Sequence, residues 1–385
     1  MSNDRKHILY VACLCSSVVE GGLMNNSPEI VGLQAQKYHR LIARGLAMND
    51  ADVTVLCYHL GIEQIGIANG CEEVEERVLY HYIVPNLHSK LRYIQVLREV
   101  SSYVKFFLMK YSDGVVLCDV LNFTLSMAAV FAVQKRRRKI VGIITDFPEM
   151  LTGGQNLTSR ISWYVINKCS AYVVLTQQMR DRLPIGKEAI VIEGQVDINM
   201  SDEKNSLDDK YEKKVCLYAG LLHQKYGVKT LVKAFMQLEM DDVELHLYGD
   251  GDCVEFIQNC HDERIKYFGK RPNREIVEAE KRATLLINPR PSSEEFTKYS
   301  FPSKNLEYMV SGTPILTSKL PGMPQEYYPY IYMFDEEDVN SMTSKLSDIL
   351  NRNQEELHKQ GERAKEFVIR EKNNVAQTKK ILEYI

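Results

Sequence analysis

The stretch Lys214–Phe235, KVCLYAGLLHQKYGVKTLVKAF, contains a complete strand–loop–helix unit. It opens with a short apolar run that ends at Gly220 and has the length of a strand buried on both faces. A short loop with His223 and Lys225 follows, and Gly227 precedes residues with helical spacing. Such units repeat in parallel α/β sheets, so this stretch predicts that fold class.

The same alternation continues on both sides of this stretch. Apolar runs separated by helical-period segments lie at 7–14, 52–58, 114–120, 139–145, 171–176, 189–194, 243–251, 265–269, 284–289 and 314–318. They predict an α/β protein with two doubly wound, Rossmann-like domains facing a central cleft.

We expect the first domain at 1–197, a linker without apolar periodicity at 198–213, and the second domain at 214–365. The C-terminal helix, at about 366–385, is expected to return to the first domain.

Composition narrows the class of protein. A chain of 385 residues is long enough for two domains, and its formal charge of −3 predicts no nucleic-acid partner. Nine cysteines, an odd number without a CxxC pair, indicate reduced thiols in a cytoplasm and neither a disulfide framework nor a zinc knuckle. The apolar run near the N-terminus is shorter than a membrane span and fits a buried strand better than a signal peptide.

The stretch Ser300–Pro314, SFPSKNLEYMVSGTP, predicts a helix that begins near Pro302 and ends at Gly312. Lys304 adds a full positive charge to the amino end of that helix, which already attracts anions. Glu307, three residues later, can accept two hydrogen bonds from sugar hydroxyls. The sequence therefore predicts a site for a phosphate and a neighbouring ribose.

Other loops at strand ends carry further candidates. Lys225, beside His223, lies before a helix and could bind an anion, although a solvated loop lysine explains it equally well. Gly249 in LYGDGD allows close approach of the backbone to a ligand, and the DxD pattern there is better explained as a turn than as a metal site. Arg271 could offer a planar guanidinium to a base, with a plain turn as the alternative. Arg290, Glu294 and Glu295 share one further loop.

Four segments together resemble the donor domain of GT-B glycosyltransferases of family 4, the retaining enzymes of bacterial polysaccharide assembly. The segments are YAGLLHQKYGVKTLVKAF, ELHLYGDGD, IKYFGKRPNREI and YSFPSKNLEYMVSGTPILTS. The resemblance covers about 214–350, with PSKNLEY similar to a sub-pattern of that family. It implies that Lys225 contacts the donor diphosphate, that Ser303, Lys304 and Asn305 form the helix start over the phosphates, and that Glu307 holds the ribose.

The sequence departs from the pattern of that family at two positions. Leu221 stands where an arginine is common, and Tyr299 stands where the first glutamate of an acidic pair is usual. Glu294 or Glu295 is the candidate to replace that glutamate, because the preceding loop is longer than usual.

The first half offers weaker candidates. Gly21 and Gly22 stand where the family keeps a glycine-rich loop against donor and acceptor, and the motif is not the GxGxxG of nicotinamide dehydrogenases. Asp146 is the candidate for contact with the transferred sugar, although a turn-forming aspartate explains it slightly better.

Two stretches bear on location. Five cations at 135–139 and the cationic, aromatic helix at 89–111 could contact anionic lipid at the inner face of the membrane. Cations at a helix end and a packed surface helix are the commoner explanations.

Together these observations predict a cytoplasmic, retaining hexosyltransferase that uses a nucleoside diphosphate sugar, by resemblance UDP-linked, and a glycan or lipid-linked acceptor in capsule or exopolysaccharide assembly. No cofactor and no metal are expected, because Lys225 and Lys304 would balance the charge of the leaving diphosphate. Glu294, Glu295 and Asp146 are the carboxylates expected near the sugar. A nucleotide-sugar 2-epimerase of the same fold and a catalytically silent nucleotide- or partner-binding relative remain as alternatives.

Overall fold

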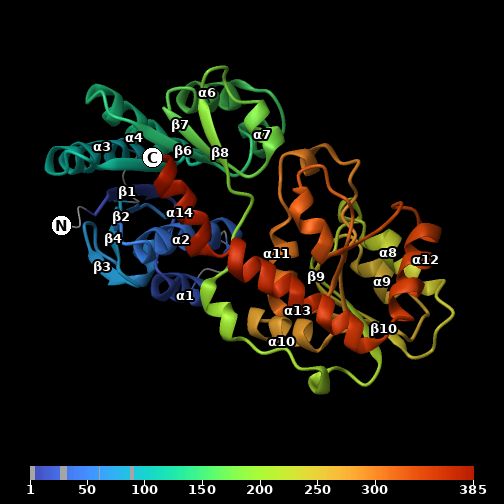
Figure 1. Ribbon diagram of the computed structural model, residues 1–385. Helices are drawn as coiled ribbons and strands as arrows, with labels where there is room; N and C mark the ends of the chain where they lie inside the picture. The colour runs from blue at the N-terminus through green and yellow to red at the C-terminus, as the bar shows by residue number, and fades with distance from the viewer. Residues whose placement is uncertain (1–4, 27–32, 60, 87–90) are drawn as a thin grey trace. The chain divides into compact units, whose positions relative to one another are not determined.

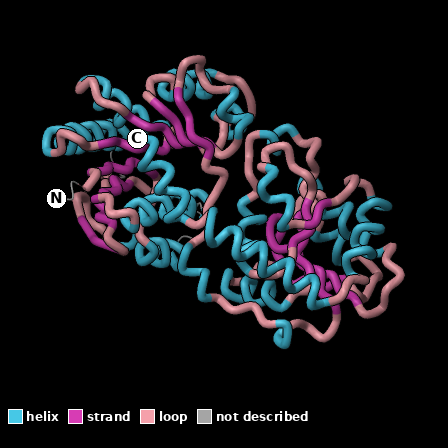
Figure 2. Tube along the Cα trace, viewed as in Figure 1, coloured by secondary structure: helices cyan, strands magenta, loops and turns pink. Residues whose placement is uncertain are grey.

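The computed structural model describes residues 5–26, 33–59, 61–86 and 91–385. The chain forms two compact units, one made of Met1–Gln195 with Asn374–Ile385 and the other of Val196–Asn373. Each unit has its own sheet with helices on both faces, as Figure 2 shows for strands in magenta and helices in cyan. The predicted fold class, two doubly wound α/β units, is confirmed.

The first sheet has eight strands in the order β3-β4-β2-β1-β5-β6-β7-β8, and only β3 runs antiparallel to its neighbour. The strands are β1 (His7–Ala12), β2 (Asp52–Cys57), β3 (Glu72–Glu75), β4 (Val78–Tyr82), β5 (Val115–Asp119), β6 (Ile140–Ile144), β7 (Ala171–Val174) and β8 (Glu188–Val191). Six of them coincide with predicted apolar runs. The β3–β4 hairpin was not predicted, because β3 has no buried residue and β4 alternates buried with half-buried residues, so neither is a continuous apolar run.

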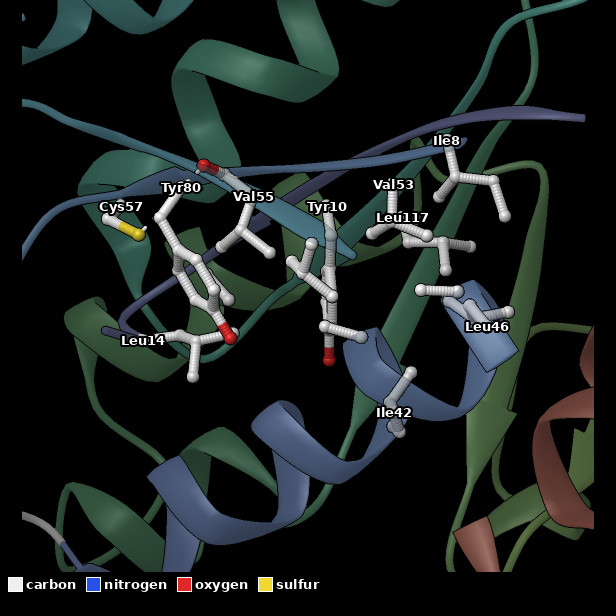
Figure 3. Close-up of a cluster of buried hydrophobic side chains, with 14 of the residues drawn as sticks. Ile8, Tyr10, Leu14, Ile42, Leu46, Val53, Val55, Cys57, Tyr80 and Leu117 are labelled. Carbon is white, nitrogen blue, oxygen red and sulfur yellow. Dashed lines mark hydrogen bonds between the residues drawn. The ribbon is translucent and has the colours of Figure 1, made fainter. Parts of the chain in front are cut away.

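Helices cover both faces of this sheet (Figure 1). They are α1 (Ser17–Asn26), α2 (Leu33–Met48), η2 (Ile62–Ile65), α3 (Arg92–Lys110), α4 (Phe123–Lys135), α5 (Pro148–Leu151), α6 (Leu157–Ile166), α7 (Gln177–Asp181) and α14 (Asn374–Tyr384). Figure 3 shows Ile42 and Leu46 of α2 turned toward Ile8 and Tyr10 of β1 in the buried core of this unit.

The C-terminal helix α14 belongs to the first unit, as expected from the fold class. It packs on α2, where the amide of Asn49 donates to the carbonyl of Val375 at 2.8 Å and to Thr378 Oγ1 at 3.1 Å. A Cβ on Gly45 would collide with the carbonyl of Asn374, so glycine is required for this close approach. The return begins at Asn374 rather than near 366, because the preceding helix stays in the second unit.

The second sheet has six parallel strands in the order β11-β10-β9-β12-β13-β14. The strands are β9 (Lys214–Leu221), β10 (Val243–Asp250), β11 (Ile265–Gly269), β12 (Leu285–Asn288), β13 (Ile315–Thr317) and β14 (Tyr332–Met333). The helices and short 3₁₀ turns are η3 (Ile198–Asp202), η4 (Leu207–Asp209), η5 (Gln224–Tyr226), α8 (Val228–Met236), α9 (Val254–Gln258), α10 (Asn273–Arg282), η6 (Glu295–Lys298), α11 (Ser303–Ser311), η7 (Gln325–Tyr330), α12 (Val339–Leu350) and α13 (Gln354–Glu371).

The segment 198–213, expected to be a linker, belongs to the second unit. The amide of Asn205 donates to the carbonyl of Ser311 at 2.8 Å, and the ammonium of Lys210 donates to the carbonyls of Lys281 and Ala283 at 2.7 and 2.9 Å. These contacts join polar side chains to backbone carbonyls. They therefore produce no apolar periodicity in the sequence, and the segment could not be recognised as part of the second unit. No helix among the described residues has both the length and the apolar character needed to cross a membrane.

Candidate functional site

The candidate site lies at the carboxyl edge of the second sheet, where parallel strands deliver their loops to one place. Gly220 and Gly249, at the ends of β9 and β10, have φ values of 147° and 127°. A Cβ on Gly249 would collide with the carbonyl of Gly220, and a Cβ on Gly227 would collide with the carbonyl of Pro289. Glycine therefore lets the loops after β9, β10 and β12 approach one another.

The helix α11 opens onto this edge. It begins at Ser303, after Pro302, which offers no side-chain cap, and it ends at Gly312, whose φ is 78°. These bounds confirm the predicted helix. Its first turn leaves backbone N–H groups without helical partners, which favours a bound anion.

Lys304, in that first turn, is half-buried against the end of β9. A Cβ on Gly220 would collide with its Nζ, and Nζ lies 4.2 Å from the centroid of the Tyr218 ring. Tyr308, one turn further along α11 and fully buried, fixes this position. Its hydroxyl accepts the N–H of Ala219 at 2.9 Å and donates to the carbonyl of the same residue at 3.4 Å. The ammonium is thus held at the mouth of the helix.

Burial and neighbouring carboxylates act on the pKa of Lys304 in opposite directions. Burial lowers the pKa of Lys304 to about 8, Glu307 and Glu280 act in the opposite direction, and Arg290 lowers it further. A positive group that reduces the pKa of another lies close enough to repel it. Lys304 and Arg290 are therefore two neighbouring cations, and a bound anion would stabilise both.

Arg290 follows β12 and is held by aromatic rings. Its guanidinium carbon lies 4.4 Å from the centroid of the Phe296 ring and 5.7 Å from that of Tyr226, and Nη2 donates to Ser300 Oγ at 3.1 Å. Stacking on rings suits a planar guanidinium and restricts its orientation. The loop before α11 thus presents a positioned cation to the helix mouth.

The loop after β9 is tied to the loop after β10. His223 Nδ1 lies 3.1 Å from the carboxylate of Asp252, whose other oxygen accepts the N–H of Gln224 at 2.8 Å. Lys225 is exposed, with its ammonium 5.1 Å from the centroid of the Tyr226 ring. Tyr226 in turn packs edge to face with Phe296, so Lys225 and Arg290 flank one aromatic pair.

Three further residues predicted to contact the donor lie elsewhere in the second unit or at the start of α11, and their roles at the donor stay predictions. Asn305 is buried, and its amide accepts from Asn288 at 2.7 Å and donates to Thr317 at 3.4 Å, so its side chain joins α11 to the sheet. Arg271 donates from Nε to the carbonyl of Phe268 at 3.1 Å and lines a surface pocket of about 360 Å³ beside α10. Ser303 is exposed at the first position of α11.

The two predicted carboxylates stand at the start of η6. Glu294 is half-buried and its carbonyl accepts the N–H of Thr297 at 3.0 Å, while Glu295 is exposed. Both are within two residues of Phe296, which supports Arg290. The loop itself is fixed by Glu337, whose carboxylate accepts the N–H of Ser292 at 2.8 and 3.0 Å. No local pattern in the sequence pointed to Glu337, because it is distant along the chain.

The first unit corrects one prediction. Gly21 and Gly22 lie within α1 rather than in a glycine-rich loop; Gly22 faces Ile65 and Gly21 is exposed. Helical spacing of Val19 and Leu23, both buried, outweighs the low helix propensity of two glycines. Asp146 accepts the N–H of Phe147 at 2.9 Å, the geometry expected of a turn-forming aspartate.

A buried polar cluster in the first unit was not foreseen. Nδ1 of His39, in α2, forms a hydrogen bond with the Tyr10 hydroxyl. Nε2 of His39 lies 3.6 Å from the carboxylate of Asp119 at the end of β5. Burial lowers the pKa of His39, and Asp119 partly offsets that effect. The three residues are far apart in the sequence, so no motif could have indicated the cluster.

Comparisons with known proteins agree with this architecture. Residues 199–367 match the family model described as glycosyl transferases group 1. Sucrose-phosphate synthase from Thermosynechococcus elongatus aligns over 99% of this chain and 98% of that chain, with a TM-score of 0.68 and 15% identity. A glycosyltransferase from Rickettsia africae covers the same shares, with a TM-score of 0.65 and 15% identity.

Anabaena HepE, in complex with UDP and glucose, aligns over 98% of both chains with a TM-score of 0.61 and 15% identity. No protein of curated function matches the sequence. At such identities the structural likeness shows the fold. Together with the family match, it confirms the predicted resemblance to GT-B glycosyltransferases.

Proposed function

From the match of residues 199–367 to glycosyl transferases group 1 and a fold shared along the whole chain, we propose that this protein transfers a sugar from a nucleoside diphosphate sugar to an acceptor hydroxyl. The observation that carries the proposal is the half-buried ammonium of Lys304 at the mouth of α11, beside Gly220 and close to Arg290. The second unit would hold the donor.

The donor diphosphate would bind between the cations. Lys304 and the first N–H groups of α11 would contact one phosphate, and Arg290 would offer two parallel N–H donors to phosphate oxygens. Lys225, on the other side of Tyr226, would add a third charge from a flexible stem. Occupation of this site would remove the repulsion that Lys304 and Arg290 exert on each other in the free protein.

Arg290 would replace the arginine that this chain lacks at position 221. Leu221 is 55% exposed at the end of β9 and contributes no charge. Arg290 reaches the same edge of the sheet from the loop after β12 and acts electrostatically on Lys304. A cation supplied from another loop would keep the charge balance of the site.

Glu307, half-buried in α11 and electrostatically linked to Lys304, would accept the ribose hydroxyls. The base would lie toward the loop that carries Arg271. Anabaena HepE holds UDP and glucose, and we propose UDP as the nucleotide for this chain as well.

In the reaction, the bond between the sugar anomeric carbon and the diphosphate oxygen breaks, and its electron pair stays on that oxygen. The acceptor hydroxyl oxygen bonds to the anomeric carbon, and its proton is released. Lys304, Arg290 and Lys225 would stabilise the leaving diphosphate without a metal ion. The transfer would retain the anomeric configuration, with Glu294, Glu295 or Asp146 near the positively charged sugar.

We propose a cytoplasmic protein whose acceptor is a growing glycan or a lipid-linked glycan in polysaccharide biosynthesis. The experiment incubates the purified chain with UDP-, GDP-, ADP- and dTDP-sugars, with and without EDTA, and follows release of nucleoside diphosphate and thermal shift. We expect stabilisation and slow hydrolysis with one nucleotide class, unchanged by EDTA. Stabilisation without turnover would favour a silent binder, an epimerised sugar would favour a 2-epimerase, and no response to any donor would overturn the proposal.

A further inference from the structure

Three helices of the first unit form one layer on one face of its sheet. The chain passes from β4 through α3 to β5, through α4 to β6 and through α6 to β7, and each step moves the same way across the sheet. Right-handed crossovers in one direction place their helices on one face. Ser101 Oγ of α3 donates to the carbonyl of Ala128 of α4 at 3.3 Å, and Figure 1 shows the two helices side by side.

The carboxyl ends of these helices gather at the amino edge of the sheet, because each helix leads into a parallel strand. Two contacts confirm this arrangement. Arg138, just after α4, donates to the carbonyl of Gly114 before β5 at 3.2 Å, and Gln134 donates to the carbonyl of Lys168, after α6, at 3.5 Å. This edge is opposite to the one that receives ligands in such sheets.

Large apolar side chains stand exposed on this layer. Phe106 and Met109 near the end of α3 are 60% and 68% exposed, and Tyr164 of α6 is 55% exposed. Phe131 of α4 and Ile161 of α6 are also exposed. The second unit, described throughout, has only Leu221 and Met236 in this state. Other elements of the first unit also expose apolar side chains, among them Val18, Val74 and Ile185, so exposure of this kind is a property of the first unit as a whole.

The same helices are strongly basic. α3, α4 and α6 carry six lysines and arginines against one acidic residue, Glu99, and residues 136–139 with Lys168 add five cations after the helix ends. The whole chain, in contrast, has a formal charge of −3. Arg136, Arg137 and Lys139 lie beyond α4 and are exposed, so these three cations exceed what is needed to stabilise the carboxyl end of that helix.

We propose that this basic-apolar face, made of Phe106, Met109, Lys110, Phe131, residues 135–139 and Tyr164, docks on an anionic lipid membrane. Separate exposed rings among long cationic side chains suit an interface in which the rings enter the headgroup region and the cations contact lipid phosphates. A protein partner would be expected to meet a continuous apolar patch. The inference does not depend on the proposed donor chemistry. Lys90, a cation of the expected membrane helix, lies outside the described residues.

The test measures co-sedimentation of the full chain with neutral phosphatidylcholine vesicles and with vesicles that contain phosphatidylglycerol. We expect binding to the anionic vesicles only, weakened by added salt. The variant Lys135→Gln/Arg136→Gln/Lys139→Gln should lower the partition coefficient by about 100-fold, from a contribution of about fivefold per cation. Phe106→Ser/Met109→Ser should also weaken binding, by removing two exposed apolar side chains that would enter the headgroup region.

Matched controls remove the same chemistry from the second unit. Lys233→Gln/Lys266→Gln/Lys359→Gln deletes three exposed cations there, and Met236→Ser deletes an exposed apolar side chain. We expect both to bind vesicles as the unaltered chain does. The proposal would be overturned if the first triple variant still bound anionic vesicles. It would also be overturned if the unaltered chain bound no vesicles and instead formed a dimer that the basic-apolar variants dissociate. Unchanged melting temperatures show that each variant is folded.

Discussion

At the scale of single residues, Lys304 is the group on which donor binding would most depend in the proposed function. Its ammonium is held at the mouth of α11 by Tyr218 and Gly220. We expect Lys304→Ala to weaken UDP binding by about 1.5–3 kcal/mol, the range for hydrogen bonds to charged groups. Titration calorimetry measures the loss, with Lys298→Ala as a control that removes an exposed cation from the same loop. Equal affinity of Lys304→Ala and the control would contradict the assignment.

The lowered pKa of Lys304, about 8, predicts how UDP binding depends on pH. A bound diphosphate favours the charged ammonium, so the pKa rises on binding. Affinity is therefore full below pH 8 and falls as pH increases through 8 toward the pKa of the complex. Calorimetry at pH 9 in buffers of different ionisation enthalpy should detect proton uptake that is absent at pH 7. Lys304→Arg, which stays charged, should bind without that uptake, and uptake in both proteins would assign it elsewhere.

Arg290 should act on the diphosphate and not on the nucleoside. We expect Arg290→Ala to weaken UDP binding by about 1.5–3 kcal/mol and to leave binding of uridine unchanged, because only the phosphates reach a guanidinium between Phe296 and Tyr226. Arg290→Lys should restore part of the loss, since it keeps charge but not the stacked plane. Titration calorimetry with UDP and with uridine measures both affinities. Equal losses of affinity for the two ligands would show that the substitution acts through the structure of the site.

The sequence predicted part of this site. Periodicity and end signals located α11, and with it the positions of Lys304 and Glu307 along the helix, because these signals are local. Asn305 was expected at the ligand but lies inside, bonded to Asn288. The partners that hold Lys304 and Arg290, above all Tyr218 and Phe296, come from other loops. Contacts between distant segments leave no trace in one sequence, so their identity needed the structure.

At the scale of elements, the turn between β9 and η5 sets the shape of the site. Gly220→Ala would place a Cβ on the ammonium of Lys304 and strain a backbone φ of 147°. We expect it to abolish measurable UDP binding and to lower stability by about 1–3 kcal/mol. Gly269→Ala is the matched control, because its φ is 69° but its Cβ would have 3.9 Å of space from Tyr267.

The control should lose stability in the same range and keep UDP affinity, as shown by denaturant unfolding and calorimetry. If both variants bind UDP equally well, the proximity of Gly220 to the donor site is not functional. The pair separates backbone strain from the collision with Lys304, since only the first variant has both.

Elements with strong local signals were predicted well, and those held by tertiary contacts were not. Apolar strands such as β1 and β9 matched their runs because both faces are buried. The segment 198–213 was expected to be a linker, yet Asn205 and Lys210 attach it to the second unit through backbone carbonyls. Gly21 and Gly22 were assigned to a loop on family resemblance, and the buried neighbours of α1 hold them in a helix.

At the scale of the whole molecule, the two units are built differently from the chain. The second unit is one continuous segment, Val196–Asn373, whereas the first needs α14 from the end of the chain. In α14, Asn374, Gln377, Thr378 and Ile381 are buried. The two units should therefore differ in their response to a donor and to truncation.

We expect scanning calorimetry of the full chain to show two transitions, of which UDP raises only the one that belongs to the second unit, in proportion to the logarithm of UDP concentration. A chain that stops after Asn373 should lose stability in the other transition, because Gly45 of α2 and Asn49, just after α2, lose their partners on α14. Its UDP-dependent transition should remain, since both layers that cover the second sheet, including α13, are intact. A single transition that UDP raises as a whole, or loss of the UDP response on truncation, would show that the donor site depends on both units.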